Sequence, residues 1–213
     1  MANPVDHPDL TKKDAIQKKD AINKKEAKRI ATRKKILETA THLFARTGYH
    51  KTTIQDIAYH IGMTTGAVFH HYSSKADILA DVMVQLNQSF DQYIEYLEKA
   101  SADYKTMING MVEIFLDRVQ NRPDTIIALA SLTVEFSGMR GPKIVKSQAA
   151  YDKFVEAFEK ALDRISKKKT NRAAAVCFIA GLQSVALNAL VRDEEMDIED
   201  LVEGFISLIA ENR

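Results

Sequence analysis

The sequence lacks features that several classes of protein require. Its single cysteine, Cys177, excludes a disulfide framework within one chain and fits a reducing cytoplasm. No apolar run approaches the roughly 20 residues that span a bilayer, and the polar, acidic N-terminus predicts no signal peptide. No window alternates polar and apolar residues with a period of two, so an all-α fold is expected.

Groupings that carry catalysis or bind metals are also missing. There is no Ser-His-Asp arrangement, glycine-rich phosphate loop or metal-ligand spacing, so we expect neither an enzyme nor a cofactor. All six histidines fall within residues 1–71, but neighbours such as His70 and His71 point about 100° apart on a helix. Contacts with phosphate explain them better than a metal does. Cys177 lies in an apolar helical stretch, where we expect a buried, inert thiol.

The most informative segment is residues 52–75, TTIQDIAYHIGMTTGAVFHHYSSK. Apolar residues recur from Ile54 to Ile61 at helical spacing, which predicts one short helix. Gly62 then suits a left-handed turn. Thr64 or Thr65 caps a second helix, whose inner face carries Val68 and Tyr72. A short helix, a glycine-bearing turn and another short helix match the helix-turn-helix of DNA-binding proteins, although an ordinary helical hairpin is the alternative.

The flanking segments favour DNA binding. An apolar stripe from Ile36 to Phe44 predicts a packing helix that ends at Gly48. Ser74 caps a later helix, and Asp77 favours its first turn.

The run ILETATHLFARTGYHKTTIQDIAYHIGMTTGAVFHHYSSKADIL resembles the N-terminal domain of the TetR (tetracycline-repressor) family of bacterial transcription regulators. The shared elements are the LF-x4-G-Y segment, the TT-x2-DIA-x3-G helix, the G-x-V-F-H-H-Y recognition helix and the following S-K. The resemblance implies an N-terminal three-helix helix-turn-helix domain, a larger C-terminal helical domain, nine helices and a dimer. At Phe69 the family more often has a tyrosine that contacts a DNA phosphate, and phenylalanine lacks that hydrogen bond.

We predict that the helix-turn-helix contacts double-stranded DNA through a defined set of side chains. Thr65 and Gly66 approach base edges, and Lys75 binds phosphate. The full predicted set is Thr52, Thr53, Thr64, Thr65, Gly66, Ala67, Phe69, His70, His71 and Lys75.

Charge is distributed unevenly along the chain. Residues 1–75 carry 14 basic and 7 acidic side chains, a net charge of +7, whereas residues 76–213 carry 16 and 22, a net charge of −6. A basic end that carries the motif is typical of an electrostatic DNA footprint. We divide the chain into a basic arm (1–29), a DNA-binding domain (30–75) and an effector-binding and dimerisation domain (76–213).

The basic arm contains the repeats KKDAIQ, KKDAIN and KKEAKR. A six-residue step does not keep Ile16 and Ile22 on one helical face, so the arm has no apolar stripe to bury. It is either a frayed, solvated tail or an arm that reaches along the DNA and gains helix when it binds.

Six helices are expected after residue 73, over 74–99, 104–121, 123–136, 143–166, 170–191 and 197–211. The last two are rich in small or apolar residues. They either pack inside one chain or form a four-helix interface in a homodimer, which a palindromic operator requires.

The middle helices form the expected effector chamber, although methionines and aromatic residues at helical spacing also describe an ordinary core. Glu135 lies in an apolar helix, where a buried charge needs a partner. It can pair with Arg118 or Arg140, face solvent or meet a ligand. The predicted ligand-binding residues are Ser89, Tyr93, Met111, Phe115, Glu135 and Phe136.

We therefore expect a cytoplasmic homodimeric transcription regulator, a repressor released by a small hydrophobic or amphipathic effector. Glu135 favours an effector with a cation or a hydrogen-bond donor. The alternatives are an architectural or cell-division DNA binder without a small ligand, and an all-α carrier of lipophilic ligands.

Overall fold

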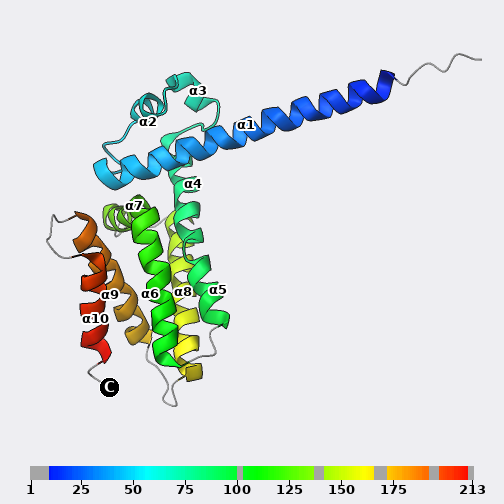
Figure 1. Cartoon of the computed structure of the whole chain (residues 1–213). Helices are drawn as coiled ribbons and strands as arrows, with labels where there is room; N and C mark the ends of the chain where they lie inside the picture. Colours follow the sequence, from blue (N-terminus) through cyan, green and yellow to red (C-terminus); the bar gives the residue numbers. More distant parts are fainter. Residues whose placement is uncertain (1–9, 100–102, 137–141, 166–171, 192–196, 211–213) are drawn as a thin grey trace, which may run out of the picture.

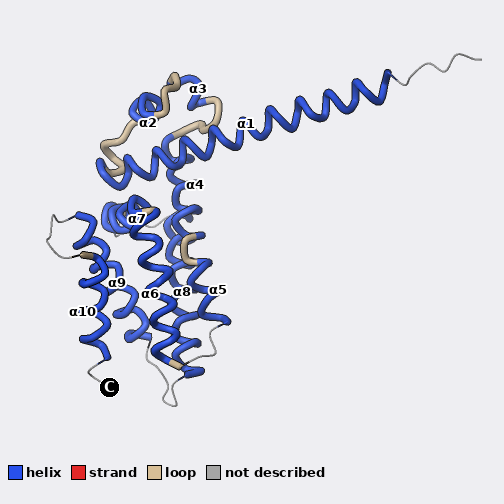
Figure 2. The backbone as a smooth tube through the Cα atoms, in the orientation of Figure 1, coloured by secondary structure: helices blue, strands red, loops and turns tan. Residues whose placement is uncertain are grey.

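The computed structural model describes residues 10–99, 103–136, 142–165, 172–191 and 197–210, and all the regular structure in these ranges is helical. Figure 1 shows their arrangement, and Figure 2 shows that loops are short where they are described. The all-α prediction is confirmed. The helices are α1 (Leu10–Thr47), α2 (Ile54–His60), α3 (Thr65–Phe69), α4 (Lys75–Gln88), α5 (Asp91–Lys99), α6 (Tyr104–Asn121), α7 (Pro123–Glu135), α8 (Pro142–Ile165), α9 (Arg172–Val191) and α10 (Ile198–Ala210).

The N-terminal domain is built on the C-terminal part of α1, with α2 and α3 on one side of it (Figure 1). Its core is the predicted apolar stripe of α1, which packs against Ile57 of α2 and Val68 of α3. Ile36, Ile57 and Val68 are fully buried. Burial of these side chains holds together two helices that are too short to be stable alone.

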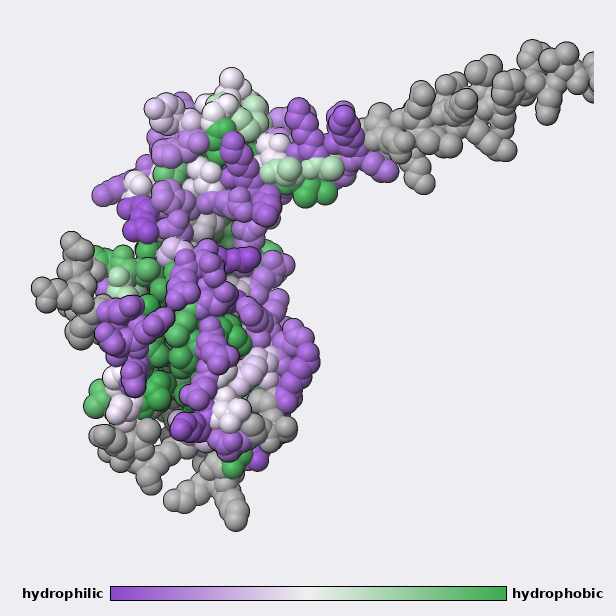
Figure 3. Space-filling model, viewed as in Figure 1, coloured by the Kyte–Doolittle hydropathy of each residue, from purple (hydrophilic) through white to green (hydrophobic). Residues whose placement is uncertain are grey.

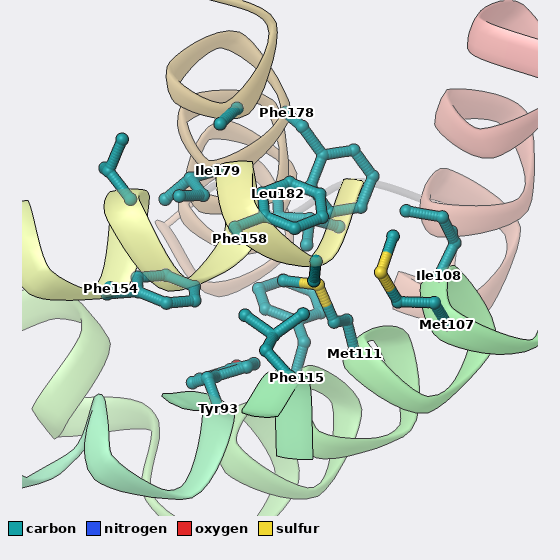
Figure 4. Packing of buried hydrophobic residues seen from close by; sticks show 14 of the residues in the cluster. Tyr93, Met107, Ile108, Met111, Phe115, Phe154, Phe158, Phe178, Ile179 and Leu182 are labelled. Carbon is teal, nitrogen blue, oxygen red and sulfur yellow. The ribbon is translucent and has the colours of Figure 1, made fainter. Parts of the chain in front are cut away.

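The C-terminal body contains α5 to α10, with α4 running into it from the N-terminal domain (Figure 1). Its core combines aromatic, methionine and aliphatic side chains (Figure 4), including Met107, Met111 and Phe158. Figure 3 shows hydrophobic surface running down this body beside α10, whereas the N-terminal domain is mostly hydrophilic from the same side.

The two domains share part of their core through α7. Ala128 and Leu132 of α7 are buried in the N-terminal cluster together with Ile78, Val82 and Leu86 of α4. Helix α1 makes its most extensive contact with α7. Helix α7 therefore contributes side chains to the cores of both parts of the molecule, whereas α4 contributes to the N-terminal one.

One helix boundary differs from the prediction. The expected helix over 74–99 is divided into α4 and α5, so ten helices are described instead of nine. At the break, the Ser89 N–H bonds to the Leu86 carbonyl at 3.2 Å and the Phe90 N–H bonds to the Asn87 carbonyl at 3.0 Å. These tight i, i+3 bonds replace the α-helical pattern without any proline or glycine.

The basic arm also differs from the expectation. From Leu10 it is helical and continuous with the packing helix, so α1 has 38 residues. Figure 1 shows this part of α1 projecting away from the rest of the molecule. Extending an existing helix fixes one residue for each bond gained and avoids the cost of nucleation. The expected gain of helix on binding DNA is therefore wrong for residues 10–29.

Helix α9 corrects two further expectations. It is long and apolar enough to cross a membrane by length and composition, a weak indication, since core helices of soluble proteins meet the same test. Here α9 packs on α7, α8 and α10. Cys177 is exposed, not buried as expected. Because α9 is apolar nearly all round, its periodicity does not indicate which face lies inside.

Candidate functional site

The turn between α2 and α3 is built from local hydrogen bonds. Thr53 caps α2 in a capping box with Asp56, and Thr64 caps α3 by accepting the Ala67 N–H at 3.2 Å. Gly62 has a φ of 69°, which a residue with a Cβ resists. The Met63 N–H bonds back to the Ala58 carbonyl at 2.9 Å. The predicted helix-turn-helix is thus present with the expected glycine and the expected cap on α3, and the Thr53 cap on α2 is an addition to the prediction.

Helix α3 presents an exposed side beyond its buried Val68. Thr64, Gly66 and His70 are exposed, and the Phe69 ring is 49% exposed although it is apolar. Thr65, Ala67 and His71 are half-buried. The N-terminal end of α3 and its outer side are therefore accessible, as a helix that enters the major groove requires.

Two basic residues of α1 fix the position of this motif, and the sequence analysis did not identify them. Arg33 donates to the His71 carbonyl at 2.7 Å and to Asp81 Oδ2 at 2.6 Å, and its guanidinium lies 4.1 Å from the centre of the Tyr72 ring. Lys35 donates to the Ile61 carbonyl at 3.1 Å, at the end of α2. These bonds couple α1, α2, α3 and α4 into one unit.

Two residues predicted to contact phosphate have internal roles. The Thr52 side chain is 1% exposed and its hydroxyl donates to the Gly48 carbonyl at 2.8 Å. The Lys75 ammonium donates to the carbonyls of Tyr49 and Thr52, at 2.8 and 2.7 Å. Their assignment to phosphate needs correction, because both side chains hold the loop after α1 in place. Thr53 remains exposed but its hydroxyl bonds to Asp56 at 2.7 Å.

His71 is poorly suited to carry a positive charge. Burial lowers the pKa of His71, and the charges of His70, Arg33 and Arg29 lower it further. His71 is therefore neutral at pH 7, and any bond that it makes to phosphate is donated by a neutral ring.

Tyr59 is an exposed aromatic side chain that the sequence analysis overlooked. It lies on α2 and is 83% exposed, the ring contacting only its neighbour His60 among the recorded ring contacts of the described residues. A single exposed aromatic residue is common on protein surfaces, so only its place on the helix-turn-helix makes Tyr59 a candidate contact. The sequence did indicate this exposure. Tyr59 falls between Ala58 and Ile61, which belong to the buried apolar stripe, so its side chain points away from the core.

A cavity of about 1150 Å³ is lined by residues of α1 and of α4 to α9. Four of the six predicted ligand-binding residues line it: Ser89, Tyr93, Met111 and Phe115. Figure 4 shows Tyr93, Phe115 and Phe154 converging from α5, α6 and α8. Burial raises the pKa of the Tyr93 hydroxyl to about 12, so this group is uncharged at neutral pH.

The other two predicted ligand-binding residues, Glu135 and Phe136, do not line this cavity. The Glu135 carboxylate instead accepts the backbone N–H groups of Tyr49 and His50, at 2.9 and 2.8 Å, and contacts the His50 ring nitrogen. Phe136 packs against the Tyr49 ring at 5.3 Å. Arg118 is not the recorded partner of Glu135, and Arg140 lies outside the described residues.

Arg118 is the lining residue that the sequence analysis missed as a ligand contact. It shares a helical face with Met111 and Phe115, at spacings of seven and three residues, and this register was the available signal. Among the described residues, no cluster of three or more His, Cys, Asp or Glu side chains is arranged to hold a metal ion.

Comparison with known proteins agrees with this geometry. Residues 36–82 match the model of the family described as bacterial regulatory proteins, tetR family. The probable HTH-type transcriptional regulator ArpR of Pseudomonas putida is 28% identical over 102 residues, which cover 45% of this chain and 49% of ArpR. The chain thus spans about half the length of that relative. The regulator AcrR of Shigella flexneri is 24% identical over 84% of this chain and 88% of its own.

The fold has solved counterparts. A transcriptional regulator from Saccharomonospora viridis, crystallised with choline, superposes with a TM-score of 0.70 and 23% identity, over 85% of this chain and 97% of that one. The helix-turn-helix in residues 52–75, the helical body behind it and these matches agree. Residues 36–82 therefore form the DNA-binding segment typical of bacterial regulatory proteins of the tetR family.

Proposed function

We propose that this protein is a cytoplasmic transcription repressor that binds a palindromic operator as a homodimer and leaves it when a small molecule binds the cavity. The observation that carries the proposal is the exposed end of α3, which Arg33 and Lys35 hold rigidly against α1. A side chain can read a base edge only when its helix is fixed in the groove, and these bonds provide that fixation.

Dimerisation is supported by an exposed strip of small side chains on α9. Ala173, Ala174, Cys177, Ala180 and Ser184 recur at helical spacing and are all exposed. Leu208, 67% exposed, extends the apolar surface on α10. Small residues let two helices approach closely, and two half-sites about one turn of DNA apart call for a two-fold dimer.

Control by an effector is supported by the position of α7. Its first turn contains Asp124, which bonds to His42 at 2.7 Å and to Arg46 at 3.1 Å on α1. Its last residue is Glu135, held to the loop after α1. A ligand that displaces α7 or α4 changes the orientation of the DNA-binding domain, provided that it binds one orientation better than the other.

A carrier of lipophilic ligands is the second candidate, because the cavity alone would serve a carrier equally well. Fluorescence anisotropy with a labelled random duplex, measured from low to moderate salt, separates the two. A regulator binds DNA with an affinity that falls steeply with salt, because bound phosphates release counterions. A carrier shows no such binding. Sedimentation velocity on the same sample tests the dimer.

A further inference from the structure

The charged side chains that line the cavity differ in whether they have an ionic partner. Three carboxylates line it, and each has a cationic partner on the protein. Asp124 bonds to Arg46 and His42, Asp152 bonds to Arg172 at 2.6 Å, and Glu38 lies 3.7 Å from Lys34. Two arginines, Arg118 and Arg122, also line the cavity, and no recorded ion pair of the described residues includes them. The lining side chains carry three positive and three negative charges, and among them only the two arginines have no ion pair recorded in the described part of the protein.

Arg118 is poorly solvated for a cation. Its Nε is buried and has no hydrogen-bond partner in the described part of the protein. Burial lowers the pKa of Arg118, the neighbouring Arg122 acts in the same direction, and Tyr93 and Asp117 oppose them. The Arg118 guanidinium lies over the face of the Tyr93 ring, 4.8 Å from its centre. A buried donor left without a partner costs free energy, which an anionic partner offsets.

Apolar surface lies next to this cation. Phe90 and Phe154 are stacked with their ring centres 5.3 Å apart, and Met111, Phe115 and Leu182 continue the lining. A site of this kind matches a molecule with an acidic group at one end and an apolar body.

We propose that the cavity binds an amphipathic organic anion, whose acidic group pairs with Arg118 while its apolar part packs against the phenylalanines. This deepens the proposed effector control and rests on it. It reverses the expectation that Glu135 selects a cationic effector, because Glu135 is already occupied by the loop after α1. A carboxylate and a phosphate ester share the required chemistry.

Isothermal titration calorimetry of the full chain tests the proposal with four probes of one chain length, below their micelle concentrations: decanoate, decyl phosphate, decanol and decyltrimethylammonium. We expect decanoate or decyl phosphate to bind at least tenfold more tightly than decanol, and the cation to bind weakest. Whichever anion binds better identifies the acidic group. Equal affinity for decanol and both anions overturns the proposal, and so does the absence of binding by all four.

Arg118→Gln should remove the preference for anions, and Arg118→Lys should keep part of it, because the charge remains. Lys160→Gln, at an exposed cation of α8 outside the cavity, is the matched control and should change nothing. A preference that survives Arg118→Gln overturns the assignment to Arg118. The probe series on the unmodified chain remains decisive if a variant fails to fold.

DNA binding measured on the same samples without a probe shows whether a failed result concerns the anionic effector or the regulatory function. Salt-dependent DNA binding together with no preference for anions rejects only the anionic effector. Anion binding without DNA binding rejects the regulatory role and leaves the site intact.

Discussion

The carboxylate of Glu135 accepts the backbone N–H of His50 at 2.8 Å, which joins the end of α7 to the loop that follows α1. The Tyr49 N–H adds a second bond at 2.9 Å. Gly48, immediately before, has a φ of 88° and directs these N–H groups out of the helix end. With Asp124 bound to α1 at the other end of α7, this helix is fastened to the DNA-binding domain at both ends.

Replacing Glu135 by alanine should destabilise the protein by about 1–3 kcal/mol, because backbone donors in the half-buried loop lose a charged acceptor. Denaturant unfolding of the full chain measures this change. Glu98→Ala, at an exposed carboxylate of α5, is the matched control and should fall within about 0.5 kcal/mol of the unmodified chain. A loss no larger than that of the control would show that the contact with the loop adds nothing to stability.

Acid should remove the contribution of the Glu135 carboxylate to the free energy of unfolding. Burial raises the pKa of Glu135, but the N–H groups of His50 and Tyr49 and the His50 side chain outweigh it and leave the pKa below the usual value of 4.5. Because the folded pKa is lowered, the stabilisation is complete above that value and declines as the pH falls through the folded pKa. The difference in unfolding free energy between the unmodified chain and Glu135→Gln should shrink over that range. A difference that stays constant down to the acid end would contradict this assignment.

Lys75 and Lys51 should give opposite results on substitution by methionine. Lys75→Met should lower the melting temperature, because three loop carbonyls, those of Tyr49, His50 and Thr52, lose their donor. Lys51→Met should leave melting unchanged, since Lys51 is exposed, but should flatten the dependence of log affinity for DNA on log salt by about 0.9 if it neutralises a phosphate. Thermal melting and anisotropy titrations check both. The reverse pattern would restore Lys75 as the phosphate contact.

Deletion of residues 1–29 tests the basic arm. Side chains described from residue 23 to residue 31 are all exposed, including those of Lys24, Lys28 and Arg29. If the arm lies along DNA, its deletion should reduce the salt slope by about 0.9 for each lost phosphate contact. Circular dichroism should show a loss of helix without DNA, because residues 10–29 are already helical. An unchanged salt slope would make the arm a solvated extension.

Local patterns predicted the DNA-binding motif well. Gly62 and Thr64 act through bonds within the motif to neighbours within five residues, so their roles could be predicted from spacing alone, whereas the cap that Thr53 forms was not predicted. The same holds for α6 and α7, which meet at Asn121 and Pro123 close to the expected residues.

Partners distant in the sequence could not be predicted in this way. Glu135 bonds to a loop 85 residues away, and Arg33 bonds to Asp81 48 residues away. Nothing in the helical periodicity of α7 indicates that its last carboxylate faces another domain. The break between α4 and α5 at Ser89 could not be predicted from helix propensities either. It depends on i, i+3 hydrogen bonds and contains no proline or glycine.

Selection of binding sites from a random pool of duplex DNA tests the central claim most directly. With the full chain at moderate salt, we expect enrichment of a palindrome whose half-sites are centred about one helical turn apart. Thr65→Ala should relax the preference at one base position of each half-site, at a cost of about 1–3 kcal/mol. A pool that shows no enriched sequence, or an identical site for Thr65→Ala and the unmodified chain, would contradict the assignment of α3 to the major groove.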